Sequence, residues 1–434
     1  MTGLINGGLG GMIYTYIGGT FGMSCAILAM AEMASMAPTS GGQYHWVSEF
    51  APKRYQRFLS YVTGWVCVLG WHTGIAGCCY TVANMIIGII SINHPETYIP
   101  QAWHGTLLII GIAFIAIVFN TFFAQKLPLV EGFILILHFF GFFAVLIPLW
   151  VLAPRNTPKQ VFQTFEDRGG WGSSGLACLV GLIAPIYALI AEEIKDASRV
   201  LPLAMVWTLI LNSLTGLIML ITFSFCVHNI DEALESSTGF PFISVFVHAT
   251  RSVSGATGMT AIMLILQACA GISNVATTSR QVDNRYIVPL NALFVSFIVV
   301  CLMSLVNIGS SIAFNAIISL GVASLLSSYI ISISCVRLKR WRGEPLPPAR
   351  WSMGKWSSTV ETIAILFLVI AWVFSFFPLT RSVDVQTMNW SCAIFGGVVI
   401  FALIYYFTYA RNVYKGPVTR IRPWVELVDH RRND

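Results

Sequence analysis

Long apolar runs with almost no charge dominate the sequence. Its 434 residues are 56% hydrophobic and 10% charged, whereas soluble domains are about 25% charged and about 45–50% apolar. The few polar residues cannot cover the cores that a soluble chain of this length would need. The apolar excess therefore faces lipid, where a helix can satisfy its own backbone groups. The sequence predicts an all-α integral membrane protein.

Stretches of about 20 apolar residues match the hydrocarbon core of a bilayer. Eleven such stretches are expected, at 8–34, 58–92, 104–123, 130–152, 174–191, 203–227, 255–279, 287–307, 310–335, 358–378 and 391–410. The stretch at 58–92 is long for one helix but too short for two with a loop, so we interpret it as one tilted span. Residues 1–434 then form a single transmembrane domain that ends in a tail at 411–434.

Most of the 25 Lys and Arg residues fall in loops on one side of this arrangement, with dense clusters at 337–355 and 411–432. The side with the more basic loops is usually cytoplasmic, so we expect the C-terminal tail to lie inside the cell. The parity of the spans then places the residues before Gly8 outside without a cleavable signal, which suggests that a first helix is missing. The plasma membrane is the expected location, with a vacuolar or other internal membrane as the alternative.

Ionisable residues within spans are costly in lipid and are therefore functional candidates. Glu32, near the inner end of the first span, either pairs with a basic loop residue, belongs to a cytoplasmic gate or reaches water. His72 is either a satisfied packing residue or a proton carrier, and His138 is a weaker case of the same kind. Glu131 and Glu361 stand at span ends, where they complement the helix dipole and need no function.

Pro185 in LIAPIYALIA interrupts a span, because a proline removes one backbone hydrogen bond and frees a carbonyl. Broken helices are where transporters bind substrates and ions, although a simple kink explains the proline equally well.

Glycines recur in GGLGG at 7–11, in GWVCVLGWHTGIAG at 64–77 and in GVAS at 321–324. These glycines predict close packing of helices without any ligand.

The sequence does not contain the residue combinations of common active sites at a spacing that could be catalytic. Ser/His/Asp, Cys/His and paired carboxylates are all missing in this sense. An intramembrane enzyme would depend on His72 or His138. The ten cysteines lie in or beside apolar stretches without metal-site spacing, so neither a metal nor another cofactor is expected. No basic run with interleaved aromatics indicates nucleic acid, and we find no channel filter motif. Transport of a small solute across a bilayer is the function class that remains.

Several segments resemble one transporter family. Residues 31–52, AEMASMAPTSGGQYHWVSEFAP, are similar to the segment after the second helix in the fungal amino acid/choline transporter family of the amino acid-polyamine-organocation superfamily. The segments AEEIKDASRVLP at 191–202, GISNVATTSRQ at 271–281 and FNAIISLGVASLLSSY at 314–329 also resemble that family. The resemblance therefore extends along nearly the whole chain.

The resemblance implies a secondary transporter with a LeuT-like pair of inverted repeats. It would carry amino acids or related amines such as GABA or choline, coupled to protons, by alternating access around a site near the midplane. The residues expected near the cavity are His72, Thr73, Pro185, Tyr187, Asn274 and Thr277. The residues expected at the inner gate are Glu32, Glu192 and Glu193.

Departures from the family leave a second hypothesis open. The family's first helix, whose unwound backbone holds the charged ends of the substrate, is not found in the sequence. Residues 188–191 run straight into Glu192 without the family's Gly-rich turn, and the loop after Gln281 is shortened to VDNRY. On this hypothesis the chain is a truncated, non-transporting paralogue or an incomplete gene model that acts at most as a membrane scaffold.

Overall fold

The computed structural model describes residues 2–39, 41–189, 200–236, 238–282, 290–309, 313–384 and 387–417. These residues are almost entirely helical, and the described backbone forms a single isolated β-bridge, between Asn6 and Asp167. The all-α fold class expected from the sequence is confirmed.

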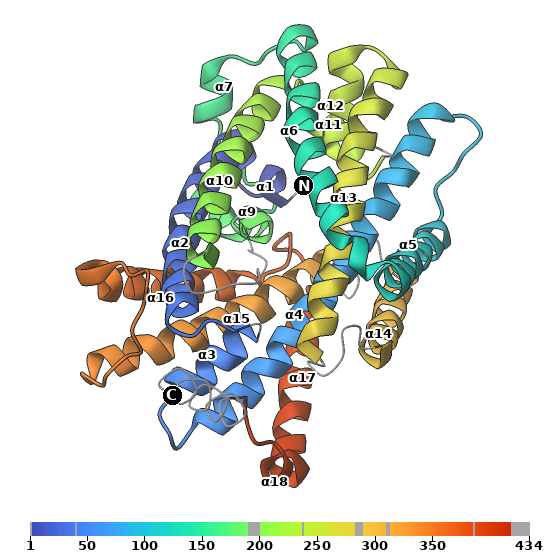
Figure 1. Ribbon diagram of the computed structural model, residues 1–434. Coiled ribbons are helices and arrows are strands. Elements are labelled where there is room, and N and C mark those ends of the chain that lie inside the picture. The colour runs from blue at the N-terminus through green and yellow to red at the C-terminus, as the bar shows by residue number, and fades with distance from the viewer. Residues whose placement is uncertain are drawn as a thin grey trace.

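The helices follow one another with mostly short connections (Figure 1). In chain order they are α1 (Thr2–Ile5), α2 (Gly8–Met36), α3 (Gly42–Phe50), α4 (Gln56–Asn93), α5 (Ala102–Phe122), η1 (Ala124–Lys126), α6 (Leu127–Leu152), α7 (Pro158–Gln163), α8 (Ser174–Gly181), α9 (Ile183–Leu189), α10 (Val200–Cys226), α11 (Ile230–Glu235), α12 (Pro241–Thr250), α13 (Val253–Val282), α14 (Leu290–Gly309), α15 (Ala313–Trp341), η2 (Gly354–Trp356), α16 (Ser357–Phe374), α17 (Ser391–Tyr405), η3 (Tyr406–Ala410) and α18 (Arg411–Val413).

Nine helical segments of the described chain are long and apolar enough to cross a membrane. They are Gly8–Met36, Gln56–Asn93, Ala102–Phe122, Ala124–Leu152, Leu201–Cys226, Val253–Thr278, Ala316–Trp341, Gly354–Phe374 and Ser391–Val413. The stretch interpreted as one long span is indeed one helix, α4. The expected spans at 174–191 and 287–307 meet shorter apolar helices, Ser174–Ile186 and Asn291–Val306, which lie close to residues outside the described ranges.

Helices α4 and α15 form the centre of the bundle. α4 packs along α15, α13 and α5, while α2 packs along α10 and α16. Most residues of α2, α4 and α15 are buried, whereas α6 and α17 bury few of theirs. Large side chains such as Phe139 and Phe140 on α6 and Phe401 on α17 are exposed. A surface this apolar faces lipid and not water, so the chain is a multi-pass membrane protein.

Glycines allow close contacts between helices, and the contact at Gly70 lies in a segment, 64–77, whose glycine pattern predicted it. A Cβ atom added to Gly22 of α2 would lie 2.2 Å from the ring of Phe367 on α16. A Cβ atom on Gly70 of α4 would lie 2.7 Å from Leu325 of α15. Only a residue without a side chain lets these helices approach so closely.

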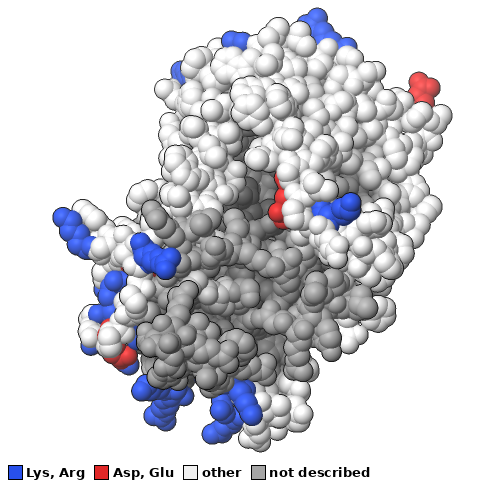
Figure 2. All heavy atoms as spheres, viewed as in Figure 1, with Lys and Arg blue, Asp and Glu red and all other residues white. Residues whose placement is uncertain are grey.

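Charged side chains gather at the ends of the bundle. In Figure 2 most of the visible Lys and Arg side chains lie along the lower and left-hand edges and at the top of the molecule. Much of the described surface between them carries no charge. Such a distribution is the one expected of a bundle whose middle lies in lipid and whose ends reach water.

Candidate functional site

The polar side chain of His72 is buried in the bundle and bonded on both sides of its ring. Nδ1 lies 2.7 Å from the Val68 carbonyl oxygen, and Nε2 lies 3.1 Å from the Ser296 hydroxyl on α14. A ring nitrogen beside a carbonyl oxygen has to donate, so in the neutral ring Nε2 accepts from Ser296. These contacts fit a packing histidine that joins α4 to α14.

Thr73 lies in a close contact between α4 and α15. Its hydroxyl donates to the Gly70 carbonyl oxygen at 2.7 Å, and the side chain is buried. A Cβ atom on Gly321 of α15 would lie 2.8 Å from the Thr73 hydroxyl oxygen. The polar group of Thr73 is therefore enclosed in a helix contact.

Asn274 and Thr277 lie on α13, on another side of α4. The Asn274 amide nitrogen is 3.2 Å from the Cys78 sulfur, and that of Gln267 is 3.4 Å from the same sulfur. Thr277 donates to the Ser273 carbonyl oxygen within its own helix. A nearby cavity lined by Cys78, Gln267 and apolar residues has a volume of about 110 Å³, which is smaller than the roughly 300–1,000 Å³ typical of small-molecule pockets.

The helix expected at 174–191 is interrupted. α8 ends at Gly181 and α9 begins at Ile183. Pro185 explains the position, because it has no N–H to donate to the carbonyl oxygen of Gly181 four residues earlier. The Tyr187 backbone continues α9, while the side chain of Tyr187 and all of Glu192 and Glu193 lie outside the described residues.

A second interruption separates α1 from α2. Gly7 and Gly8 adopt φ angles of 126° and 67°, which favour glycine because it lacks a Cβ atom. Asn6 is fully buried at this break; its amide nitrogen donates to the Leu379 carbonyl oxygen at 2.9 Å, and its amide oxygen accepts from Trp171 at 3.1 Å. The glycine pattern at 7–11 predicts close packing alone, whereas in the structure Gly7 and Gly8 make a turn. The Asn-Gly dipeptide is the signal that could have identified it.

The two interruptions lie against each other. A Cβ atom on Gly181 would be 2.4 Å from the Asn6 carbonyl oxygen. α1 contacts both α8 and α9, and Figure 1 shows α1 and α9 together within the upper half of the bundle. Helix ends carry unpaired backbone groups and partial charges. At the first break the Gly7 N–H already donates to the Glu166 carbonyl oxygen at 2.9 Å, whereas at the second break Pro185 cannot donate to the Gly181 carbonyl oxygen. Discontinuous helices of this kind are where secondary transporters bind small solutes.

The expected site residues fall into two groups around α15. His72, Thr73, Asn274 and Thr277 lie on α4 and α13. Pro185 lies on α9, where a Cβ atom on Gly19 of α2 would be 3.5 Å from it. α15 contacts both α4 and α9, so it links the helices on which His72, Thr73 and Pro185 lie.

Glu32 belongs to a buried ionic cluster that joins three helices. One Arg340 nitrogen on α15 lies 3.3 Å from the Glu32 carboxylate and 3.0 Å from that of Glu361 on α16. Ser357 donates to Glu32 at 2.9 Å, and Ser352 also donates to it. Glu32 therefore pairs with a basic residue, although its partner lies on helix α15 and not in a loop.

Glu361 has a different role from the one expected. Its position at the start of a span suggested only a favourable interaction with the helix dipole. In the structure its side chain is 2% exposed and shares Arg340 with Glu32. In the sequence, Arg340 is 308 positions from Glu32 and 21 positions from Glu361. Partners so far apart leave no periodic signal in the sequence. We refer to Glu32, Arg340 and Glu361 as the inner cluster.

The stability of the folded protein is expected to depend on the protonation of His45 on α3, in the region between α2 and α4. Burial lowers the pKa of His45, and nearby Glu49 opposes that shift only in part. The folded protein therefore favours neutral His45. The contribution of His45 to the free energy of unfolding is complete above the unfolded pKa of about 6.5 and is lost as the pH falls below it. Between about pH 7.5 and pH 5.5 we expect the melting temperature of the wild type to fall more than that of His45→Gln. Equal falls in thermal unfolding would contradict this assignment.

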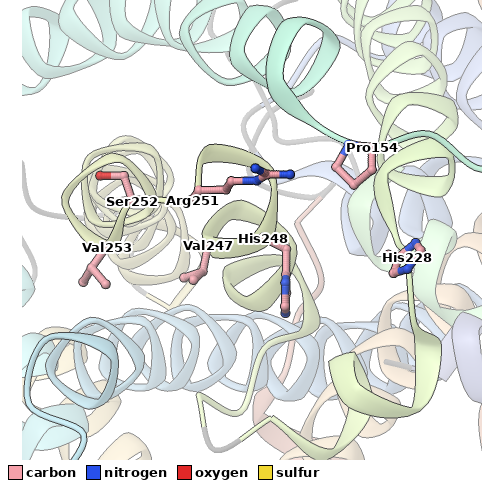
Figure 3. Close-up of a pocket in the computed structure, with 7 residues that line it drawn as sticks. All are labelled: Pro154, His228, Val247, His248, Arg251, Ser252 and Val253. Atoms are coloured by element: carbon pink, nitrogen blue, oxygen red, sulfur yellow. The ribbon is translucent and has the colours of Figure 1, made fainter.

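An open pocket of about 380 Å³ lies where α6, α10 and α12 end, lined by Pro154, His228, Val247, His248, Arg251, Ser252 and Val253 (Figure 3). In Figure 3 the Arg251 guanidinium extends toward Pro154, whereas the His248 ring points away from it. The His248 Nε2 atom lies 2.8 Å from the Glu232 carboxylate on α11. No motif in the sequence identifies this pocket, because its lining comes from separate segments.

Comparison with known proteins assigns the architecture to a family. Residues 1–285 and 277–400 match the amino acid permease family. A putative amino acid/polyamine transporter of Macrophomina phaseolina is 27% identical over 91% of this chain and 93% of its own length. A choline transporter of Saccharomyces cerevisiae is 27% identical over 94% and 76%, and amino-acid permease 2 of Neurospora crassa is 26% identical over 96% and 81%.

These matches extend over nearly the whole chain and agree with the helical membrane bundle and the family resemblance of its segments. They point to a transporter and not to an enzyme. The chain belongs to the amino acid permease family.

Proposed function

We propose that the protein is a secondary active transporter of amino acids or related amines such as GABA or choline. It works by alternating access and is coupled to protons. The observation that carries the proposal is the pair of adjacent helix breaks, α1–α2 and α8–α9, with Gly181 against Asn6. Discontinuous helices of this kind bind substrates in secondary transporters, and the names of the relatives support the substrate class.

In this proposal the substrate lies at the two breaks. A positively charged amine needs a negative partner, and the backbone carbonyls at a helix C-terminus supply partial negative charge. The carbonyl of Gly181, left without a helical donor by Pro185, is such a group. Tyr187 continues the same helix beyond the break. His72, Thr73, Asn274 and Thr277 are proposed near the transport path on α4 and α13, and the described structure keeps the hydroxyl of Thr73 enclosed against α15.

The inner cluster closes the cytoplasmic end in the same proposal. Glu32 ties the end of α2 to α15 and α16, so this end opens only when the ion pairs separate or shift. Glu192 and Glu193 are proposed at the same gate, outside the described residues. The basic segments 337–355 and 411–432 support a cytoplasmic position for this end and for the C-terminus, with the plasma membrane as the proposed location.

Proton coupling predicts how transport responds to imposed gradients. We expect uptake of labelled amine into vesicles containing the purified protein to collapse when a protonophore dissipates the pH gradient. Replacing sodium with potassium on both sides is expected to leave uptake unchanged. Radiolabel accumulation measures both effects, and uptake that requires sodium but ignores the pH gradient would reject proton coupling.

A further inference from the structure

The inner cluster places two carboxylates on one guanidinium in a buried position. The Glu32 and Glu361 side chains are 3% and 2% exposed, and Arg340 is 25% exposed. Two neighbouring carboxylates disfavour each other's ionised form, and a buried charge is stable only when it is paired and hydrogen-bonded. The cluster therefore favours a state in which one of the two carboxyl groups is neutral.

The hydrogen bonds distinguish the two carboxyl groups. Glu32 accepts from Arg340 on one oxygen and from Ser352 and Ser357 on the other. Glu361 accepts twice from Arg340 on Oε1, from Nε at 3.3 Å and from Nη2 at 3.0 Å. Its Oε2 atom is buried without a hydrogen-bond partner in the described structure. An ionised oxygen without a donor is costly to bury, while a protonated one is much less so.

The other basic side chains nearby do not supply a second cation for the Glu32 and Glu361 carboxylates. Arg337 also faces Glu361 from α15, but its Nε donates to Thr362 at 3.1 Å, in an exposed position. The Lys339 ammonium lies 5.8 Å from the ring of Phe50, and that of Lys355 lies 5.9 Å from its neighbour Trp356. Arg340 is thus the one described cation that is hydrogen-bonded to either carboxylate.

We infer that Glu361 binds one exchangeable proton, on Oε2, and that this proton controls the attachment of α2 to α15 and α16. With the proton bound, Arg340 neutralises Glu32 and holds the end of α2. When the proton leaves, the two carboxylates repel each other and compete for Arg340, so the end of α2 loosens. The link to transport rests on the function proposed above, whereas the binding of the proton does not.

The binding of the proton can be measured without any transport. Infrared difference spectra of the full chain in lipid vesicles, recorded during a pH titration, report the C=O stretch of protonated carboxyl groups. We expect the wild type to show such a band at neutral pH, and Glu361→Gln to abolish it. Glu32→Gln removes the competing anion, so in this variant the band is expected to disappear at a lower pH than in the wild type. The control Glu131→Gln, at an exposed carboxylate on α6, should match the wild type.

Two results would overturn the inference: a wild-type spectrum without a protonated carboxyl group at neutral pH, or a band that survives in Glu361→Gln. If Glu361→Gln does not fold, the direction of the shift in Glu32→Gln decides instead, and an unshifted band refutes the proposal. Uptake measured in the same vesicles is a separate readout. Absent uptake with the expected infrared pattern would reject the transport function but keep the proton site.

Discussion

Replacing Arg340 with methionine is expected to lower the free energy of unfolding by about 3–5 kcal/mol, the range for removing one partner of a buried ion pair. The reason is that Glu32 and Glu361 then remain buried without their shared cation. Methionine keeps much of the length of the arginine stem, so loss of packing contributes little. Denaturant or thermal unfolding of the purified protein in detergent measures the change.

Arg337→Met is the matched control, because Arg337 lies one turn earlier on α15 and its side chain bonds Thr362 in an exposed position. Exposed pairs contribute about 0–1 kcal/mol, so this variant should melt close to the wild type. Similar decreases in the free energy of unfolding of the two variants would show that the inner cluster contributes no more to stability than an exposed arginine does.

Gly181→Ala is expected to abolish uptake at the proposed substrate site. The added methyl group would lie 2.4 Å from the Asn6 carbonyl oxygen. Both groups belong to the backbone or are fixed to it, so one helix break has to move away from the other. Overpacking of this kind costs about 1–3 kcal/mol, and about 1.4 kcal/mol of lost binding already lowers affinity tenfold. Initial rates of labelled amine uptake, normalised to the amount of protein in the membrane, measure the effect.

Gly175→Ala serves as the control on the same helix, since the nearest atom to its added methyl group is the Ser173 hydroxyl at 3.7 Å. This variant should transport like the wild type. If Gly181→Ala also transports normally, the contact between the two breaks has no part in substrate binding.

Local sequence patterns were sufficient to predict the helical membrane fold. Apolar runs of the length of a bilayer identified the long helices, and the single helix from Gln56 to Asn93 followed from its length alone. The missing N–H of Pro185 left a broken helix and a simple kink as alternatives, and the structure shows an interruption at Gly181. Each of these inferences depends on neighbouring residues only, which is why one sequence suffices for them.

Contacts between distant segments could not be predicted in the same way. Glu32 meets Arg340 across 308 residues, and Asn6 bonds Leu379 across 373. Which helix faces which is decided by packing of the whole bundle, so neither the role of Glu361 nor the burial of Asn6 left a local signal. The same reason applies to two neighbouring residues of α4. His72 is bonded to Ser296 on α14, and Thr73 is enclosed against Gly321 on α15.

Uptake of labelled amino acids and choline by a cell that lacks its own permeases for them tests the central claim most directly. The account predicts saturable uptake above that of cells carrying the empty vector, and loss of that uptake in Gly181→Ala at an equal amount of protein. Uptake no greater than in the control cells, with the protein correctly inserted in the plasma membrane, would contradict the transport function. That result would favour the non-transporting scaffold instead.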